Sequence, residues 1–230
     1  KTNILEAISL LAPGRGLRGA ELVEMKRGHP AQDKPFAVAV TLEQDGVQSQ
    51  IGVGLDSDDD DDHERRIIKI DGRIARGQVE LAEQLSLLWL TPQMDRLWQD
   101  GPGARRKFLD RLVFSFDPAH AGRLSRYERA QRERMKLLKD GARQPSWLDG
   151  LEAIMAETGI AIAAARADVV HRLQRASGLE TQGFPSARVA LEGEIDQLLL
   201  HSSALAAEEY LRRQLTISRA TDAAQGVTQH

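Results

Sequence analysis

The sequence predicts a mixed α/β fold, in which an α/β lobe with an antiparallel β meander is followed by an inserted helical lobe. Three observations lead to this prediction. The chain opens on a short amphipathic helix. Residues 36–74 alternate apolar and polar side chains between short turns, as half-buried strands do. From residue 102 onward, apolar residues recur at helical spacing instead.

The first helix starts on a Lys1-Thr2 pair. Apolar residues follow at steps of four and three on one face, namely Ile4, Ile8 and Leu11, and Pro13-Gly14 ends the helix. A phosphate-binding P-loop ends in this way: the Lys contacts the β- and γ-phosphates, and the Thr hydroxyl ligates Mg²⁺. The positive end of the helix adds to the attraction for phosphate. The glycines that precede such a Lys are missing and the chain does not begin with Met, so we expect an internal piece of a longer protein.

The β meander is predicted strand by strand. Residues 36–42 alternate as a strand, Asp45-Gly46 is a hairpin turn, and residues 48–55 form the returning strand. Residues 65–70 form a third strand before a second hairpin turn at Asp71-Gly72.

Two further elements complete the first lobe. Residues 78–84 predict a short helix. Residues 86–90 are a compact apolar run before Thr91-Pro92, which predicts a buried strand of the main sheet.

An acidic loop covers residues 56–62. It holds six carboxylates, but it lacks the alternating ligands and the glycine of a calcium loop. We therefore favour a solvated hairpin tip over a divalent-cation site.

Composition excludes some classes of protein. The chain has 230 residues, no Cys and 41% hydrophobic residues, so disulfides and Cys-based metal sites are excluded and a core is possible. No apolar run approaches the ~18 residues that span a bilayer. The absence of Cys fits a reducing cytoplasm, where we expect the protein. The six histidines show no metal-ligand spacing.

The second half predicts helices with short breaks. Residues 122–140 form one helix, and residues 146–176 form a longer helix with an apolar seam: Leu148, Leu151, Met155, Thr158, Ile162, Ala165 and Val169. Such a seam is what two packed antiparallel helices need. Residues 188–192 predict a strand, and residues 203–214 a final helix.

The first of these helices is strongly basic on one side. The net charge of the whole chain is −3, but residues 105–139 hold eleven Lys and Arg against four Asp and Glu, or +7. One face carries Arg126, Arg129, Arg132, Lys136 and Lys139, and the other carries Leu124, Tyr127, Met135 and Leu138. The basic face is either a solvated surface or a surface that contacts DNA phosphates. No base-reading motif is present.

Three stretches resemble the RecF family of recombination-repair ATPases, which are relatives of the SMC and ABC-type ATPases. The first is Lys-Thr-Asn-Ile-Leu-Glu-Ala-Ile at 1–8 with Gly-Arg-x-Leu-Arg at 14–18. The second is Leu-Thr-Pro at 90–92 with Gly-Pro-Gly-Ala-Arg-Arg-Lys-Phe-Leu-Asp at 101–110. The third, at 126–138, matches Tyr-x-Arg-Ala…Arg-Asn-x-Leu-Leu, with Arg134-Met135 where Arg-Asn is usual. The likeness covers nearly the whole chain in order.

The resemblance implies a fold, a set of ligands and a set of partners. The fold is a P-loop ABC-type ATPase head, with residues 1–100 as part of the ATPase lobe, 101–186 as the helical second lobe and 187–230 returning toward the first. The implied ligands are ATP, Mg²⁺ and single-stranded or gapped duplex DNA. The implied partners are an ATP-dependent homodimer and mediator proteins of the RecR/RecO type, which assist recombinase loading and the SOS response. No membrane is involved.

The resemblance also assigns residues. Lys1, Thr2 and Asn3 would hold ATP, with Thr2 on Mg²⁺, and Gln93 stands where a Q-loop Gln would follow its strand. Arg15 and Arg18 would lie near the nucleotide or the dimer face, or serve the structure. Arg105 and Arg106 match a motif that would either brace the lobe or contact DNA.

The segments that complete an ATPase site, the signature and Walker B, would lie beyond residue 230. We therefore expect a weak DNA-dependent ATPase only in the full-length protein and none in this piece. Two alternatives stay open. One is another SMC- or ABC-like repair ATPase, which would carry a far longer coiled coil. The other is a DNA- or protein-binding helical module without a nucleotide.

Overall fold

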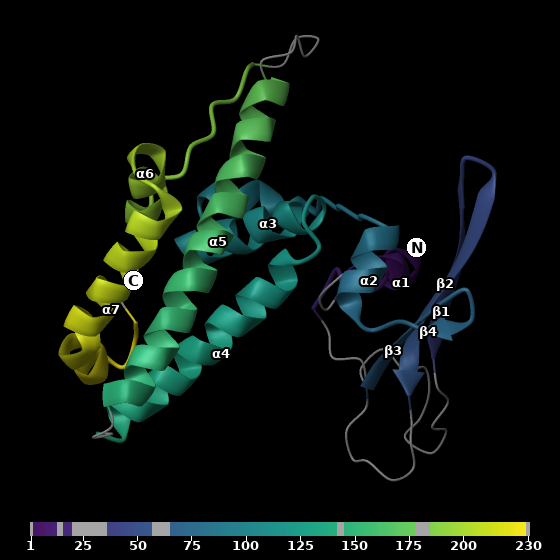
Figure 1. The fold of residues 1–230 in the computed structure, drawn as a ribbon. Helices are drawn as coiled ribbons and strands as arrows, with labels where there is room; N and C mark the ends of the chain where they lie inside the picture. Colours follow the sequence, from purple (N-terminus) through teal and green to yellow (C-terminus); the bar gives the residue numbers. More distant parts are fainter. Residues whose placement is uncertain are drawn as a thin grey trace. The chain divides into compact units, whose positions relative to one another are not determined.

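A computed structural model describes residues 2–12, 16–19, 36–56, 65–141, 145–177 and 185–228. The chain divides into two compact units, Lys1–Pro118 and Ala119–His230, which are described one at a time (Figure 1). The division lies further along the chain than the expected boundary at residue 101. The reason is that α3 (Pro102–Phe114) contacts the 3₁₀ helix η2 (Pro92–Trp98) and the segment before it.

The sheet of unit 1 is the expected antiparallel meander, with strand order β1-β2-β3-β4. Its strands are β1 (Ala37–Gln44), β2 (Val47–Asp56), β3 (Arg65–Ile70) and β4 (Arg73–Ile74). Both predicted hairpin turns are confirmed, because Asp45-Gly46 and Asp71-Gly72 have positive φ angles of 52°, 78°, 50° and 77°. A two-residue turn of this kind matches the twist of the strands it joins. The acidic residues 57–62 lie outside the described residues.

One face of the sheet carries the core of unit 1. The register aligns Val40 with Ile51 and Ile51 with Ile70, so apolar side chains face the same side across three strands. Leu81 of α2 (Gln78–Gln84) and Leu11, just after α1 (Thr2–Ser9), pack against this face. The predicted helical face of α1 is only partly correct. Leu11 is buried beyond the end of the helix, whereas Ile4 and Ile8 are exposed.

The predicted strand at residues 86–90 is wrong as an element, although the segment is extended. Leu87 and Trp89 are half-buried and alternate with the exposed Leu88 and Leu90, as in a strand. A strand also needs hydrogen-bonded neighbours. Among the described residues, the sheet contains only β1 to β4.

Unit 2 is helical. It consists of α4 (His120–Lys139), α5 (Pro145–Ser177), α6 (Glu194–His201) and α7 (Ala204–Gln225). The predicted pair of long helices is confirmed, since α4 packs along α5, and α7 packs against both (Figure 1). Within the part of the chain that the structure describes, no helix is long and apolar enough to cross a membrane.

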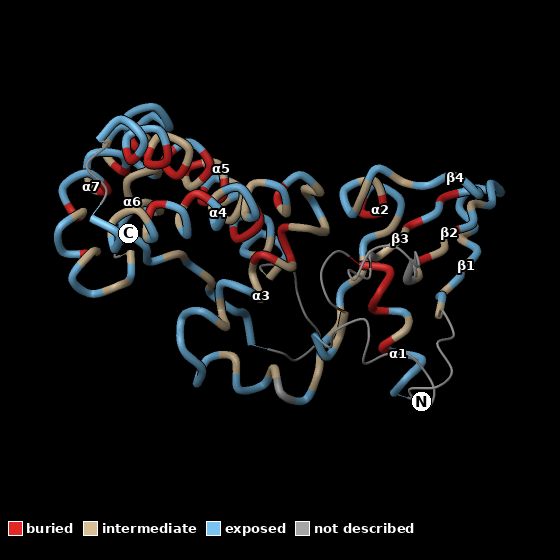
Figure 2. Tube along the Cα trace, turned by 90° about the horizontal axis from the view of Figure 1, so that it is seen from below, coloured by how far each residue is buried: buried red, intermediate tan, exposed pale blue. Residues whose placement is uncertain are grey.

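The core of unit 2 lies where these helices meet, and its buried positions are red in Figure 2. It includes Met155 and Ile160 of α5 and Leu211 and Leu215 of α7. Gly159 allows this close packing, because a Cβ there would lie 3.1 Å from the Leu211 side chain. The predicted seam of α5 is therefore largely correct, with Ala165 only half-buried.

The C-terminal predictions need two corrections. Residues 188–192 form no strand, because the segment has no regular structure and its side chains are mostly exposed. The final helix does not end at residue 214 but continues to Gln225, where Gly226 closes it with φ 72° and donates its N–H to Asp222 O at 2.8 Å. A left-handed glycine is a common helix end. The sequence pattern missed α6 altogether.

Candidate functional site

Helix α1 begins at Thr2, which is where the sequence places the start of a phosphate-binding helix. The side chains of Thr2 and Asn3 are exposed at its N-terminal end. The first N–H groups of a helix have no partner within the helix, so this end attracts anions. Lys1, the other half of the expected pair, lies outside the described residues.

The segment after α1 is bound back onto the helix. Leu17 donates its N–H to Ser9 Oγ at 2.6 Å, and Arg18 donates its N–H to Glu6 Oε1 at 3.2 Å. The Arg18 guanidinium lies 3.7 Å from the other oxygen of Glu6. Gly16 makes this approach possible, since its φ is 76° and a Cβ would lie 2.9 Å from Ser9 Oγ. These contacts favour a structural role for Arg18; Arg15 lies outside the described residues.

The opposite end of α1 is held by the sheet. Arg66 of β3 donates to the carbonyl oxygens of Leu10 and Ala12, the latter at 3.1 Å. A cation at a helix C-terminus satisfies free carbonyls and complements the helix dipole. Burial lowers the pKa of Arg66. The helix that presents Thr2 is therefore fixed at its far end and along its side.

The second part of the predicted site follows the extended segment. Gln93 is the second residue of η2, which follows Thr91. The side chain of Gln93 lies outside what the structure describes. Arg105 at the start of α3 donates Nη1–H to Asp100 O at 2.7 Å, so it braces the loop before the helix. Arg106 is exposed.

The basic face of α4 is exposed as predicted. It consists of Arg126, Arg129, Arg132, Lys136 and Lys139. Two of these cations have acidic neighbours: Arg126 lies 3.1 Å from Glu157 of α5, and Arg132 lies 3.7 Å from Glu128 one turn earlier. Arg105 and Arg106 belong to the other unit, Lys1–Pro118.

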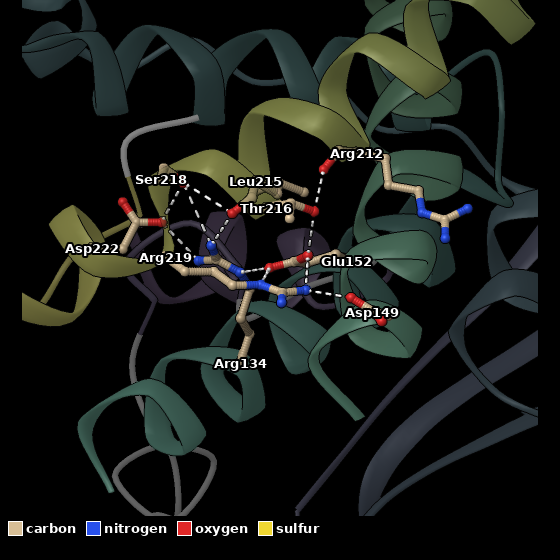
Figure 3. Close-up of polar contacts among 9 residues, drawn as sticks. All are labelled: Arg134, Asp149, Glu152, Arg212, Leu215, Thr216, Ser218, Arg219 and Asp222. Atoms are coloured by element: carbon tan, nitrogen blue, oxygen red, sulfur yellow. Dashed lines mark hydrogen bonds and ion pairs between the residues drawn. The ribbon is translucent and has the colours of Figure 1, made fainter. Parts of the chain in front are cut away.

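The sequence pattern missed a buried ionic network in unit 2 (Figure 3). Arg134 of α4 is fully buried and donates to Glu152 of α5 at 2.9 Å, to Asp222 of α7 at 2.7 Å and to Leu215 O at 2.6 Å. Arg134 follows the core residue Ala130 by one helical turn, and this spacing could have predicted its burial. A charged residue is, however, ordinarily assigned to the surface.

Arg219 of α7 extends this network toward solvent. It donates two hydrogen bonds to Glu152, at 2.9 and 2.6 Å, and reaches Asp149 at 2.5 Å. Burial alone raises the pKa of Glu152, but hydrogen bonds from Arg219, Arg134 and Thr216 outweigh it and hold that pKa below its usual value. The network joins α4, α5 and α7, all of which belong to unit 2.

No group of three or more His, Cys, Asp or Glu within the described ranges is placed to hold a metal ion. A P-loop Mg²⁺ does not need such a group, because a hydroxyl and the phosphates are its ligands. The exposed Thr2 hydroxyl at the start of α1 is compatible with that chemistry.

Comparisons with known proteins identify relatives along the whole chain, although no protein-family model matches. The chain is 41% identical over 230 residues to the DNA replication and repair protein RecF of Mesorhizobium japonicum, covering 99% of this chain and 60% of that protein. It is 42% identical to the RecF of Rhizobium leguminosarum bv. trifolii with the same coverage. The RecF of Caulobacter sp. is 41% identical over 244 residues.

Solved structures have the same fold. The recombination mediator protein RecF with ATPrS superposes with a TM-score of 0.85 at 22% identity, covering 99% of this chain and 61% of that one. The same mediator with ATP gives 0.79 at 21% identity, covering 99% and 60%. The mixed α/β fold and the predicted resemblance are thus confirmed. The chain is thus similar to RecF proteins along nearly all of its own length, and it spans about 60% of the length of the curated relatives it matches.

Proposed function

We propose that this chain is the ATP-binding and DNA-contacting part of a RecF-like replication and repair protein. In this proposal Lys1, Thr2 and Asn3 hold the phosphates of ATP, and the Thr2 hydroxyl ligates Mg²⁺. Gln93 lies near the same nucleotide. The whole protein would dimerise on ATP, bind gapped or single-stranded DNA in the cytoplasm, hydrolyse ATP weakly, and act with mediator proteins of the RecR/RecO type in recombinase loading and the SOS response.

The observation that carries the proposal is the held helix α1. Thr2 and Asn3 of its first turn are exposed, while Arg66 and the Glu6–Arg18 contacts hold the rest of the helix. A preorganised anion site needs a helix end that does not move when the anion binds. Identity of 41% to curated RecF proteins over 99% of the chain supports the same proposal.

The nucleotide part is tested in a protein of the relatives' full length that carries this sequence. Lys1→Ala, Thr2→Ala and the control Lys107→Ala, which removes an exposed lysine of α3, are compared. Binding of a fluorescent ATP analogue and ATP-dependent dimerisation by light scattering are measured with and without gapped DNA. We expect Lys1→Ala to lose both, Thr2→Ala to lose the Mg²⁺ dependence, and the control to keep them.

A contrary result would favour a different function. If the unmodified protein binds DNA equally with and without ATP and never dimerises, the nucleotide role fails. The helical module of unit 2, with its exposed basic face on α4, would then be the better candidate for the activity.

A further inference from the structure

The basic face of α4 is not uniform. Helix α4 holds seven Lys and Arg against two Glu, and five of the cations form its exposed face. Arg126 forms an ion pair with Glu157 of the neighbouring helix α5. By contrast, Arg129, Lys136 and Lys139 have no acidic partner among the residues that the structure describes.

The three unpartnered cations lie along one stretch of helix. Arg129 and Lys139 are ten residues apart, which is ~15 Å at the rise of an α-helix. Duplex DNA presents one phosphate per ~3.4 Å of its axis on each strand, so one strand offers about four phosphates along this stretch. The phosphate supply is therefore sufficient for all three cations at once.

We propose that Arg129, Lys136 and Lys139 bind backbone phosphates of DNA, and that Glu157 limits this binding by occupying Arg126. This inference rests on the proposed function, because it specifies how the protein would contact its DNA. It adds the division of the basic face into free and occupied cations, and it gives an acidic residue of α5 a regulatory effect.

The exposure of the Arg126–Glu157 pair makes competition possible. The two side chains are 53% and 58% exposed. Exposed ion pairs are weak and screened by salt, so a phosphate can take the guanidinium from the carboxylate. Guanidinium and phosphate also form the stronger bidentate contact.

The surface suits phosphates better than bases. The only aromatic residue of α4 is Tyr127, which is half-buried, and burial raises the pKa of its hydroxyl. Sequence-independent stacking of bases needs exposed aromatic rings. Contacts from this helix should therefore depend strongly on salt and weakly on sequence.

The experiment measures DNA affinity by fluorescence anisotropy over a salt series, in the protein of the relatives' full length. Three probes are used: a duplex, a single strand and a gapped duplex. The test variant is Arg129→Gln/Lys136→Gln/Lys139→Gln. Its control is Arg175→Gln/Arg212→Gln/Arg213→Gln, which removes equal charge from exposed positions of α5 and α7.

For the duplex we expect the test variant to lower the slope of log K against log salt by about 2.7, at about 0.9 per lost contact. The control variant should leave the slope unchanged. With the single strand the loss should be about 2.1, because each contact counts about 0.7 there. A loss on one probe alone would still support the phosphate contacts and would identify which DNA form they serve.

Glu157 is tested by Glu157→Gln against Glu209→Gln, which removes an exposed carboxylate of α7. Freeing Arg126 should add about 0.9 to the slope of log K against log salt. The ratio of variant to unmodified affinity should therefore be about eightfold larger at 0.1 M salt than at 1 M. Equal effects of the two substitutions would overturn the role of Glu157.

The outcomes separate this inference from the proposed function. If the unmodified protein binds none of the three probes, the proposed DNA role fails and this inference fails with it. If it binds with a steep salt dependence and the test variant behaves like the control, DNA binding stands and the assignment to α4 is overturned.

Discussion

Replacing Arg134 should lower the free energy of unfolding of unit 2 more than replacing any exposed residue of the same helix does. Arg134 is the cation that joins α4 to α5 and α7, through Glu152 and Asp222 at 2.9 and 2.7 Å. All three side chains are fully buried. The change Arg134→Met keeps an unbranched side chain in the space and removes the charge.

The magnitude follows from what the two carboxylates keep. Glu152 still accepts hydrogen bonds from Arg219 and Thr216. Asp222 keeps the Ser218 hydroxyl at 2.8 Å but loses the buried Arg134 guanidinium. Removing one partner of a buried pair costs about 3–5 kcal/mol of stability. We expect Arg134→Met to lower the free energy of unfolding by about that amount.

The assay is urea unfolding of the chain followed by circular dichroism. The matched control is Arg132→Met, which makes the same change two residues away where the side chain is 70% exposed; it should cost less than about 0.5 kcal/mol. Adding Asp222→Asn to Arg134→Met should recover part of the loss, because it removes a buried negative charge that Arg134 balanced. If Arg134→Met and Arg132→Met unfold at the same urea concentration, the network contributes nothing measurable and the reasoning is refuted.

Three further predictions concern single contacts. The pKa of Glu152 in the folded chain lies below its ordinary value of about 4.3. The stability that the ionised Glu152 gives to the fold is therefore complete above that pH and is lost as the pH falls through the folded pKa. The urea midpoint of Glu152→Gln should thus fall less between pH ~7 and ~3 than that of the unmodified chain. Arg66→Leu should destabilise unit 1 by about 1–3 kcal/mol, since two carbonyls at the end of α1 lose a charged donor, and an unchanged thermal midpoint would contradict this. Gly16→Ala should cost more than Gly46→Ala in the same thermal assay, because both have positive φ but only Gly16 would place a Cβ against a neighbour, 2.9 Å from Ser9 Oγ; equal costs would show that the loop gives way.

The meander could be predicted closely because its signals are local. Asp45-Gly46 and Asp71-Gly72 specify two-residue turns, and the alternation beside them specifies which side chains face the core. The third strand has its predicted bounds, and the first two differ from theirs by one or two residues at each end. The short first helix was likewise predicted from its local apolar spacing, and α1 covers Thr2–Ser9.

The segment at residues 86–90 shows where local signals stop. The apolar run predicted a buried strand, whereas only Leu87 and Trp89 are half-buried and Leu88 and Leu90 are exposed. Pairing is a property of two segments, and no local pattern reports whether a neighbour is present. Leu88 and Leu90 are exposed, which the local sequence pattern did not predict.

Arg134 shows a different limit, because two correct rules conflict there. Tyr127, Ala130, Arg134 and Leu137 step by three and four, so periodicity predicts burial at position 134, while charge predicts exposure. Burial prevails because Glu152 and Asp222, which follow 18 and 88 residues later, supply the counter-charges. Neither carboxylate can be assigned to Arg134 before the helices are packed. Asp222 thereby adds a charged contact to the apolar packing that Leu211 and Leu215 of α7 make in the core of unit 2.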